Sequence, residues 1–91
     1  MKVSFVNDNA FEEFMNWAFE DKRIFKKLGT LINDIKRNRY EGIGKPEPLK
    51  HDFSGFWSRR IDEKHRLVYT IIEIAGQEDE LVIISCKDHY E

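Results

Sequence analysis

The sequence predicts an α+β domain in which two N-terminal helices pack on one face of a small antiparallel sheet. Two stretches before residue 40 repeat their apolar side chains at spacings of three and four residues, which is the period of a helix. After residue 56 the period changes to two, as in strands. The 91 residues suffice for one core and are too few for two, so we expect a single domain over residues 1–91.

A short β-type run from Lys2 to Val6 opens the chain, and the first helix is expected from about Ala10 to Ala18. The polar residues at positions 7–9 can cap this helix, and Asn9 and Glu12 have the spacing of a capping box. Its buried face is predicted to consist of Phe11, Phe14, Met15 and Ala18.

The second helix has the strongest periodicity in the sequence. Asp21 can cap it, and its predicted buried face consists of Ile24, Leu28, Leu31, Ile32 and Ile35. Charged residues occupy the other face, where we expect solvent: Lys22, Arg23, Lys26, Lys27, Asp34 and Lys36. A glycine inside a helix costs about 1 kcal/mol relative to alanine. We therefore expect Gly29 to mark a close contact with a neighbouring element.

Three strands are predicted in the second half of the chain. Side chains alternate from Trp57 to Asp62, a turn follows at 62–65, and the next strand runs from Arg66 to Glu73. Both faces of that strand carry apolar residues, so we expect it to be central in the sheet. A loop at 75–79 then leads to a last strand from Leu81 to Lys87.

Composition narrows the functional class. The formal net charge is −2, yet residues 36–66 hold nine basic and five acidic side chains, which favours a local phosphate contact over a general nucleic-acid coat. The one cysteine, Cys86, lies in an apolar run and is interpreted as a core residue in a reduced compartment. No signal peptide or membrane span is evident, so the cytoplasm is the expected location.

Glu47 is the first candidate catalytic residue. It stands between Pro46 and Pro48, and prolines stiffen the backbone and exclude a helix. A carboxylate held in this way near Lys50, Arg59, Arg60 and Arg66 suits proton abstraction beside an anionic phosphate. The alternative is a surface loop with a solvated glutamate.

The histidines supply candidates for an acid. His89 follows the last strand directly, and imidazole titrates near neutrality, so it can donate a proton to a leaving oxygen, although a terminal histidine is commonly solvated. His51 can contact phosphate, whereas His65 in a turn is more typical of a structural or exposed residue. No spacing of histidine and cysteine predicts a metal site. Carboxylate, arginine and imidazole together form the set that RNA cleavage without a metal requires.

These residues also carry a resemblance. The run Glu41-Gly-Ile-Gly-Lys-Pro-Glu-Pro-Leu-Lys-His51, the runs Phe53-Ser-Gly-Phe-Trp-Ser-Arg-Arg-Ile61 and Glu63-Lys-His-Arg-Leu-Val-Tyr69, and the ending His89-Tyr90 resemble the YoeB/Txe toxins of the RelE superfamily. The similarity covers essentially the whole chain. Two features depart from the family: Glu91 follows the tyrosine, and Lys87-Asp88 stands where an arginine and an aromatic residue are common.

The resemblance implies a RelE-like microbial ribonuclease fold and a ribosome-dependent endoribonuclease that cuts translated mRNA in the A site, without a cofactor. The implied partners are a YefM/Phd-type antitoxin, the ribosome with its mRNA, and a second copy in a homodimer, with no membrane. By the same resemblance Glu47 is the proton acceptor, His89 the proton donor and Arg66 the phosphate-stabilising cation. Lys50, Arg60 and Tyr90 would position the RNA or the catalytic groups.

Two alternatives stay open from the sequence alone. The same basic block could serve a non-catalytic RNA- or ribosome-binding module, or a protein-interaction module, that a partner protein regulates, with Trp57 and Tyr90 as stacking or anchor residues. The chain could also be only an assembly partner for an adjacent gene product. We interpret Trp57 as a core residue, because it alternates with Ile61.

Overall fold

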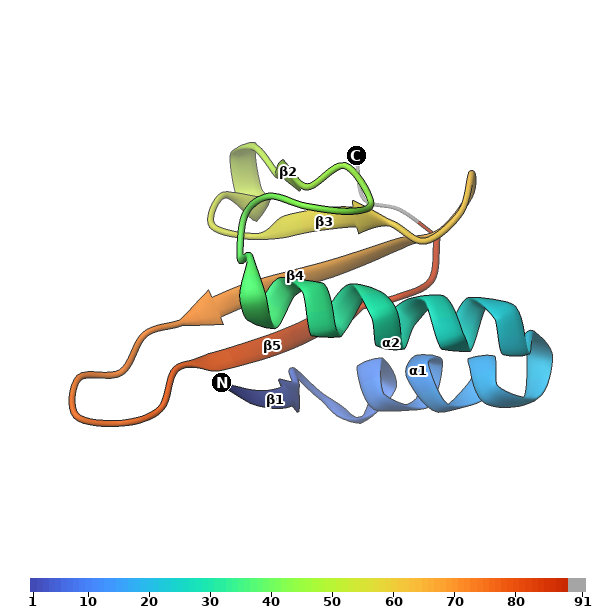
Figure 1. Cartoon of the computed structure of the whole chain (residues 1–91), viewed down its shortest axis with the longest axis horizontal. Coiled ribbons are helices and arrows are strands. Elements are labelled where there is room, and N and C mark those ends of the chain that lie inside the picture. Colours follow the sequence, from blue (N-terminus) through green and yellow to red (C-terminus); the bar gives the residue numbers. More distant parts are fainter. Residues whose placement is uncertain (89–91) are drawn as a thin grey trace.

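The computed structural model describes residues 1–88 and confirms an α+β domain in which two helices pack on a single sheet. Figure 1 shows the two helices running side by side. In chain order the elements are β1 (Lys2–Phe5), α1 (Asp8–Glu20), α2 (Lys22–Arg37), β2 (Glu47–Pro48), a 3-10 helix η1 (His51–Phe53), β3 (Trp57–Arg60), β4 (Arg66–Ile72) and β5 (Glu80–Ser85).

The sheet has five strands in the order β1-β5-β4-β3-β2. Strand β4 is central, as its two apolar faces predicted. The strands from β2 to β5 pair antiparallel, whereas β1 joins β5 in parallel, so the sheet is mixed. The sequence predicted an antiparallel sheet and did not predict this parallel pairing of β1 with β5. The sequence of β1 contains no signal for its partner, because its pairing depends on how α1 packs the chain back on the sheet.

Helix α1 differs from its prediction in both cap and face. Asn7 is the cap, and its Oδ1 accepts from the Ala10 backbone N–H at 2.9 Å, so the predicted Asn9–Glu12 capping box is wrong. Ala10 and Trp17 are buried and Phe14 packs partly against the core, whereas Phe11 and Met15 are 48% and 37% exposed. Positions 10, 14 and 17 also have helical spacing, and the large area of Trp17 decides which face turns inward.

Helix α2 follows its prediction closely. The Asp21 side chain caps it by accepting from the backbone N–H groups of residues 23 and 24. Leu28, Leu31 and Ile35 are fully buried, and the remaining predicted face residues pack partly against the same core. The expectation for Gly29 is wrong, because a Cβ there would meet no atom within 4 Å.

The two faces of the β3–β4 hairpin differ in character. Arg59 pairs with Leu67 and both are fully buried on the helix side, where Arg59 reaches Asp34 of α2. Successive side chains of a strand point to opposite faces. Arg60 and its partner Arg66 therefore point away from the helices. No helix in residues 1–88 is long and apolar enough to cross a membrane.

Candidate active site

Glu47 lies in β2, at the edge of the sheet. It pairs with Ser58 of β3, and Pro48 pairs with Trp57. An edge strand tolerates proline because the missing N–H removes no bond from the sheet interior. The Glu47 side chain is exposed. The predicted stiff, extended segment is confirmed, and it presents the carboxylate to solvent.

The register of the sheet places Glu47, Arg60 and Arg66 on one face. Residues directly opposite each other in a ladder share a face, and Glu47 pairs with Ser58, which in turn pairs with Val68. Arg60 lies two residues beyond Ser58 and therefore shares its face. Two strand spacings, about 10 Å, separate β2 from β4. One nucleotide bound across β3 can therefore contact both the carboxylate and the guanidinium groups.

Arg66 has an unusual hydrogen-bonding state. Its side chain is partly buried, and within the described residues its Nη1 is buried without a hydrogen-bond partner. A buried cationic N–H group that lacks an acceptor is costly. An anion that reached this nitrogen would supply the missing acceptor. Arg60, by contrast, is exposed.

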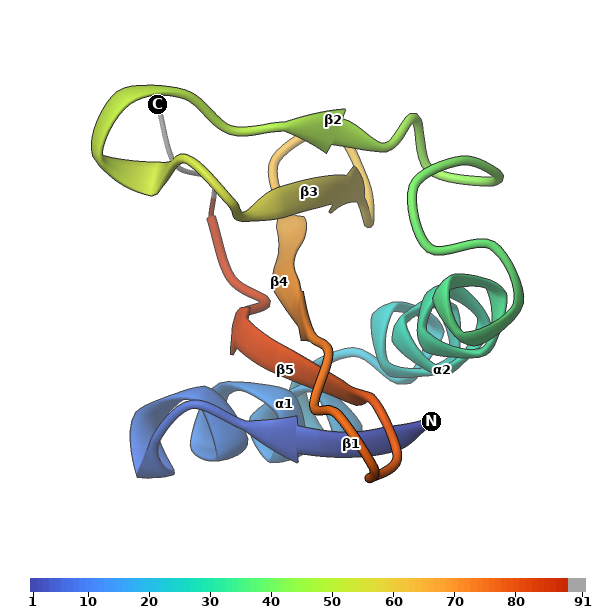
Figure 2. The same ribbon diagram turned by 90° about the vertical axis from the view of Figure 1, so that its left-hand side faces the viewer.

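Lys50 and His51 lie farther along the β2–β3 hairpin. The backbone bond from Leu49 N to Phe56 O ends the ladder, and both residues follow it as exposed side chains at the start of η1. Figure 2 shows this loop beyond the strand ends that lie farthest from α2. Phe56 and Arg60 are four residues apart, about 13 Å along an extended strand. The structure thus groups Glu47 with Arg60 and Arg66 and leaves Lys50 and His51 at the hairpin end.

The two remaining predicted site residues, His89 and Tyr90, lie outside the described residues. The residue before them is described: the Asp88 backbone O accepts from Arg66 N at 2.8 Å. The chain therefore reaches residue 88 directly beside Arg66.

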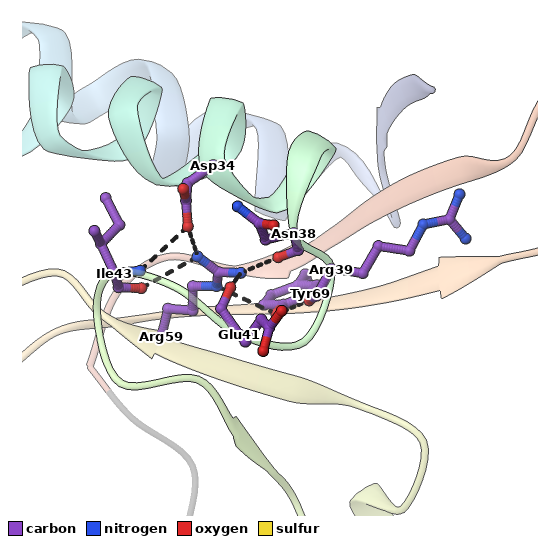
Figure 3. Close-up of polar contacts among 7 residues, drawn as sticks. All are labelled: Asp34, Asn38, Arg39, Glu41, Ile43, Arg59 and Tyr69. Atoms are coloured by element: carbon purple, nitrogen blue, oxygen red, sulfur yellow. Dashed lines mark hydrogen bonds and ion pairs between the residues drawn. The ribbon is translucent and has the colours of Figure 1, made fainter.

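Arg59 belongs to a structural cluster and not to the basic surface expected around Glu47. Its side chain is fully buried, and Figure 3 shows its guanidinium enclosed by the end of α2 and the loop that follows. Nη1 donates to Asp34 Oδ2 at 2.5 Å and to Ile43 O at 3.1 Å. Nη2 donates to the carbonyl oxygens of Asn38 at 2.5 Å and Glu41 at 2.7 Å. The sequence held a signal for this burial, since Arg59 alternates in phase with Trp57 and Ile61.

This cluster fixes the loop that leads to Glu47. Asp34 also accepts from Ile43 N at 3.2 Å, and Gly44 O accepts from Arg60 N at 2.6 Å. The hydrogen bond from Arg59 holds the pKa of the Asp34 carboxyl below its ordinary value, despite its partial burial. Gly42 and Gly44 adopt φ of 116° and 80°, which side chains rarely allow. Residues 38–44 are thereby attached to both α2 and β3, three residues before Glu47.

Trp57 is partly buried and packs against the core, as interpreted from the sequence. Its ring lies against Tyr40 with centroids 4.7 Å apart. Among residues 1–88 no three or more histidine, cysteine, aspartate or glutamate side chains group in a way that could hold a metal ion.

Comparisons with known proteins agree with this architecture. Residues 6–90 match a family model described as the YoeB-like toxin of bacterial type II toxin–antitoxin systems. The chain is 49% identical over 84 residues to Toxin YoeB of Escherichia coli K12, covering 92% of this chain and 94% of that protein. It is 44% identical over 90 residues to Toxin YoeB of Streptomyces coelicolor, covering 99% and 100%.

Solved structures show the same similarity in three dimensions. A YoeB/ParE toxin from Agrobacterium tumefaciens superposes with a TM-score of 0.91 at 40% identity, covering 99% of this chain and 100% of that one. A YoeB dimer from Staphylococcus aureus gives 0.84 at 42% identity, covering 99% and 98%. The toxin of a YoeB–YefM complex from the same organism gives 0.83 at 41% identity, with the same coverage. YafQ from Escherichia coli, 14% identical with a TM-score of 0.68, shares the fold.

Proposed function

Since the chain belongs to the family of YoeB-like toxins of bacterial type II toxin–antitoxin systems, we propose that it is a ribosome-dependent mRNA endoribonuclease. It acts in the cytoplasm, cleaves translated message in the A site and so inhibits translation. The reaction is a metal-independent transesterification: the ribose 2′-oxygen attacks the adjacent phosphorus and the 5′-oxygen leaves. The products are a 2′,3′-cyclic phosphate, or the 3′-phosphate formed from it, and a 5′-hydroxyl end.

Glu47 serves as the general base. It takes the proton of the 2′-hydroxyl as the new oxygen–phosphorus bond forms. Its exposure on β2 supports this role, because RNA can reach the carboxylate without a rearrangement of the fold. The attachment of residues 38–44 to α2 and β3 limits the freedom of the strand that carries it.

Arg66 stabilises the charge that develops on the pentacovalent phosphate. The observation that carries the proposal is its unpartnered, buried Nη1 on the sheet face that Glu47 shares. A preorganised donor aimed at developing charge is among the largest contributions to catalysis. Arg60, which lies opposite Arg66, contacts a flanking phosphate.

His89 serves as the general acid that protonates the leaving 5′-oxygen. The position of Asp88 beside Arg66 supports this role, because only one peptide unit separates Asp88 from His89. Tyr90 positions the RNA near this histidine. Lys50 and His51, at the hairpin end, contact the RNA backbone farther from the scissile bond.

The partners follow from the relatives. Solved structures include YoeB–YefM complexes and a YoeB dimer from Staphylococcus aureus. We propose a YefM/Phd-type antitoxin as the cognate partner and a homodimer of the free toxin. The ribosome with its mRNA is the substrate complex.

One experiment tests the proposal against a non-catalytic ribosome-binding module. Purified protein is added to a defined message, either free or bound to ribosomes, and the 5′ ends are mapped. The proposal expects new 5′-hydroxyl ends on the ribosome-bound message and none on the free message. Stalled ribosomes without new ends would instead identify a binding module.

A further inference from the structure

Two of the three residues before His89, Cys86 and Asp88, have backbone groups that hydrogen-bond to distant parts of the chain. The Cys86 N–H donates to Glu13 Oε1 at 2.9 Å, and Cys86 O accepts from Trp17 Nε1 at 2.9 Å. Both partners belong to α1. The first attachment therefore joins the end of β5 to the helix layer.

The second attachment joins Asp88 to the β3–β4 turn. Asp88 N–H donates to His65 Nδ1 at 2.8 Å, and Asp88 O accepts from the Arg66 N–H at 2.8 Å. The consecutive residues His65 and Arg66 thus form hydrogen bonds with the backbone N–H and the backbone C=O of Asp88. We call this pair of hydrogen bonds the Asp88 clamp.

Asp88 adopts a backbone conformation that needs such support. Its φ of 59° lies in the left-handed region, which residues other than glycine adopt at a cost in free energy. Aspartate is among the residues that tolerate it best. A conformation of this kind persists only where surrounding contacts hold it, and the Asp88 clamp provides those contacts.

His65 is held in place as an acceptor. The residue is 8% exposed, and its ring meets Trp17 edge to face with centroids 4.8 Å apart. Its backbone N–H donates to Asp62 Oδ1 at 2.6 Å, which fixes the turn. Because Nδ1 accepts a hydrogen bond from Asp88, this nitrogen carries no proton. The clamp therefore requires the neutral ring with its proton on Nε2.

We propose that His65 is a positioning residue for the ribonuclease reaction. Its Nδ1 holds Asp88 against the backbone of Arg66, so that the chain enters His89 from a fixed point beside the phosphate-binding arginine. This inference rests on the proposed function and adds to it a residue that touches no substrate. It differs from a core-packing role because it depends on one acceptor atom and not on the volume of the ring.

Two substitutions separate the acceptor from the packing. His65→Asn keeps an acceptor near the position of Nδ1, and His65→Leu fills similar space without one. With ribosome-bound message we expect His65→Leu to lower kcat by about 10²-fold with KM within twofold, since misplacing a catalytic group by about 1 Å has that effect. His65→Asn should recover at least tenfold of that loss. Glu63→Leu, at an exposed position of the same turn, is the matched control and should keep the wild-type kcat.

Hydrogen exchange of the Asp88 amide tests the clamp without reference to catalysis. We expect slow exchange in the wild type and in His65→Asn, and at least tenfold faster exchange in folded His65→Leu. Fast exchange in the wild type, or equal kcat in the Asn and Leu variants, would overturn the inference. A wild-type protein with slow exchange but no cleavage would instead refute the proposed function and leave the clamp intact.

Discussion

Arg60 and Arg66 are directly opposite each other in the β3–β4 ladder, on the sheet face that points away from the helices. Like charges in this arrangement destabilise a sheet. Packing does not require an arginine at position 60, because Arg60 is exposed. A phosphate between the two guanidinium groups would turn the repulsion into attraction, and for this reason we regard the pair as a functional feature.

Substituting Arg60 should separate binding from stability. Arg60→Gln removes the repulsion, so we expect the free energy of unfolding at low salt to rise by up to about 1 kcal/mol. The same change should raise KM for ribosome-bound message several-fold and leave kcat nearly unchanged. Urea denaturation and steady-state cleavage provide the two measurements. A lower stability together with an unchanged KM would contradict this reading of the pair.

Substituting the buried Arg59 should lower the free energy of unfolding. Arg59→Met leaves Asp34 without its ion-pair partner and three carbonyl groups without a donor, so we expect a loss of about 3–5 kcal/mol in the free energy of unfolding. Arg59→Lys should recover only part of it, because a lysine cannot reproduce the planar fork. Urea denaturation measures both variants. A stability within about 1 kcal/mol of wild type for Arg59→Met would show that the cluster is dispensable.

Two glycine substitutions provide a matched pair. A Cβ at Gly44 would lie 2.9 Å from Leu31 Cδ2 and 3.1 Å from the backbone O of Arg60, at a φ of 80°. We expect Gly44→Ala to be destabilising by at least about 1 kcal/mol. Gly29→Ala meets no atom within 4 Å inside α2, so it should stabilise by up to about 1 kcal/mol. Thermal denaturation distinguishes them, and the same sign for both would contradict the structure.

The Asp34–Arg59 ion pair predicts loss of stability in acid. The pKa of Asp34 is lowered in the folded state, first by the hydrogen bond from Arg59. The folded state therefore binds this proton less readily than the unfolded chain. The stabilisation that ionised Asp34 provides is complete above the ordinary carboxyl pKa. It is lost as the pH falls through the lowered pKa of Asp34 in the folded state. Thermal denaturation between neutral pH and about pH 3 should show a smaller decline in Asp34→Asn than in wild type; an equal decline would contradict it.

Cys86 should be chemically inert while the protein is folded. Cys86 is fully buried, and this burial raises the pKa of its thiol to about 12. The thiolate is the reactive form. A thiol reagent at neutral pH should therefore label the protein only after urea unfolds it. Rapid labelling of the native protein would show that the end of β5 opens easily.

Much of the fold was predictable because local patterns decided it. In α2 a single apolar stripe and the Asp21 cap agree, so its predicted cap and buried face are confirmed. Helix α1 offers two stripes of similar spacing, and the choice between them depends on where Trp17 finds its partner Cys86 O, 69 residues away. The parallel edge strand β1 depends equally on distant packing.

The sequence predicted candidate site residues but not their arrangement. Glu47, Arg60 and Arg66 stay predictions from the residues and from the resemblance to the YoeB/Txe toxins, and the family itself is confirmed. Their shared face follows from the strand register, which the residues themselves do not specify. His65 was expected to be structural or exposed, and its hydrogen bond to Asp88 spans 23 residues. Arg59 was grouped with the basic residues near Glu47, and its ion-pair partner Asp34 lies 25 residues earlier in the chain.

We propose above that Glu47, Arg66 and His89 act on one phosphodiester. The most direct measurement maps the 5′ ends formed on ribosome-bound message by wild type, Glu47→Gln, Arg66→Ala and His89→Gln, each checked for folding by circular dichroism. We expect abundant 5′-hydroxyl ends with wild type and a loss of at least about 10²-fold in cleavage rate for each variant. Wild-type rates in all three folded variants would contradict it.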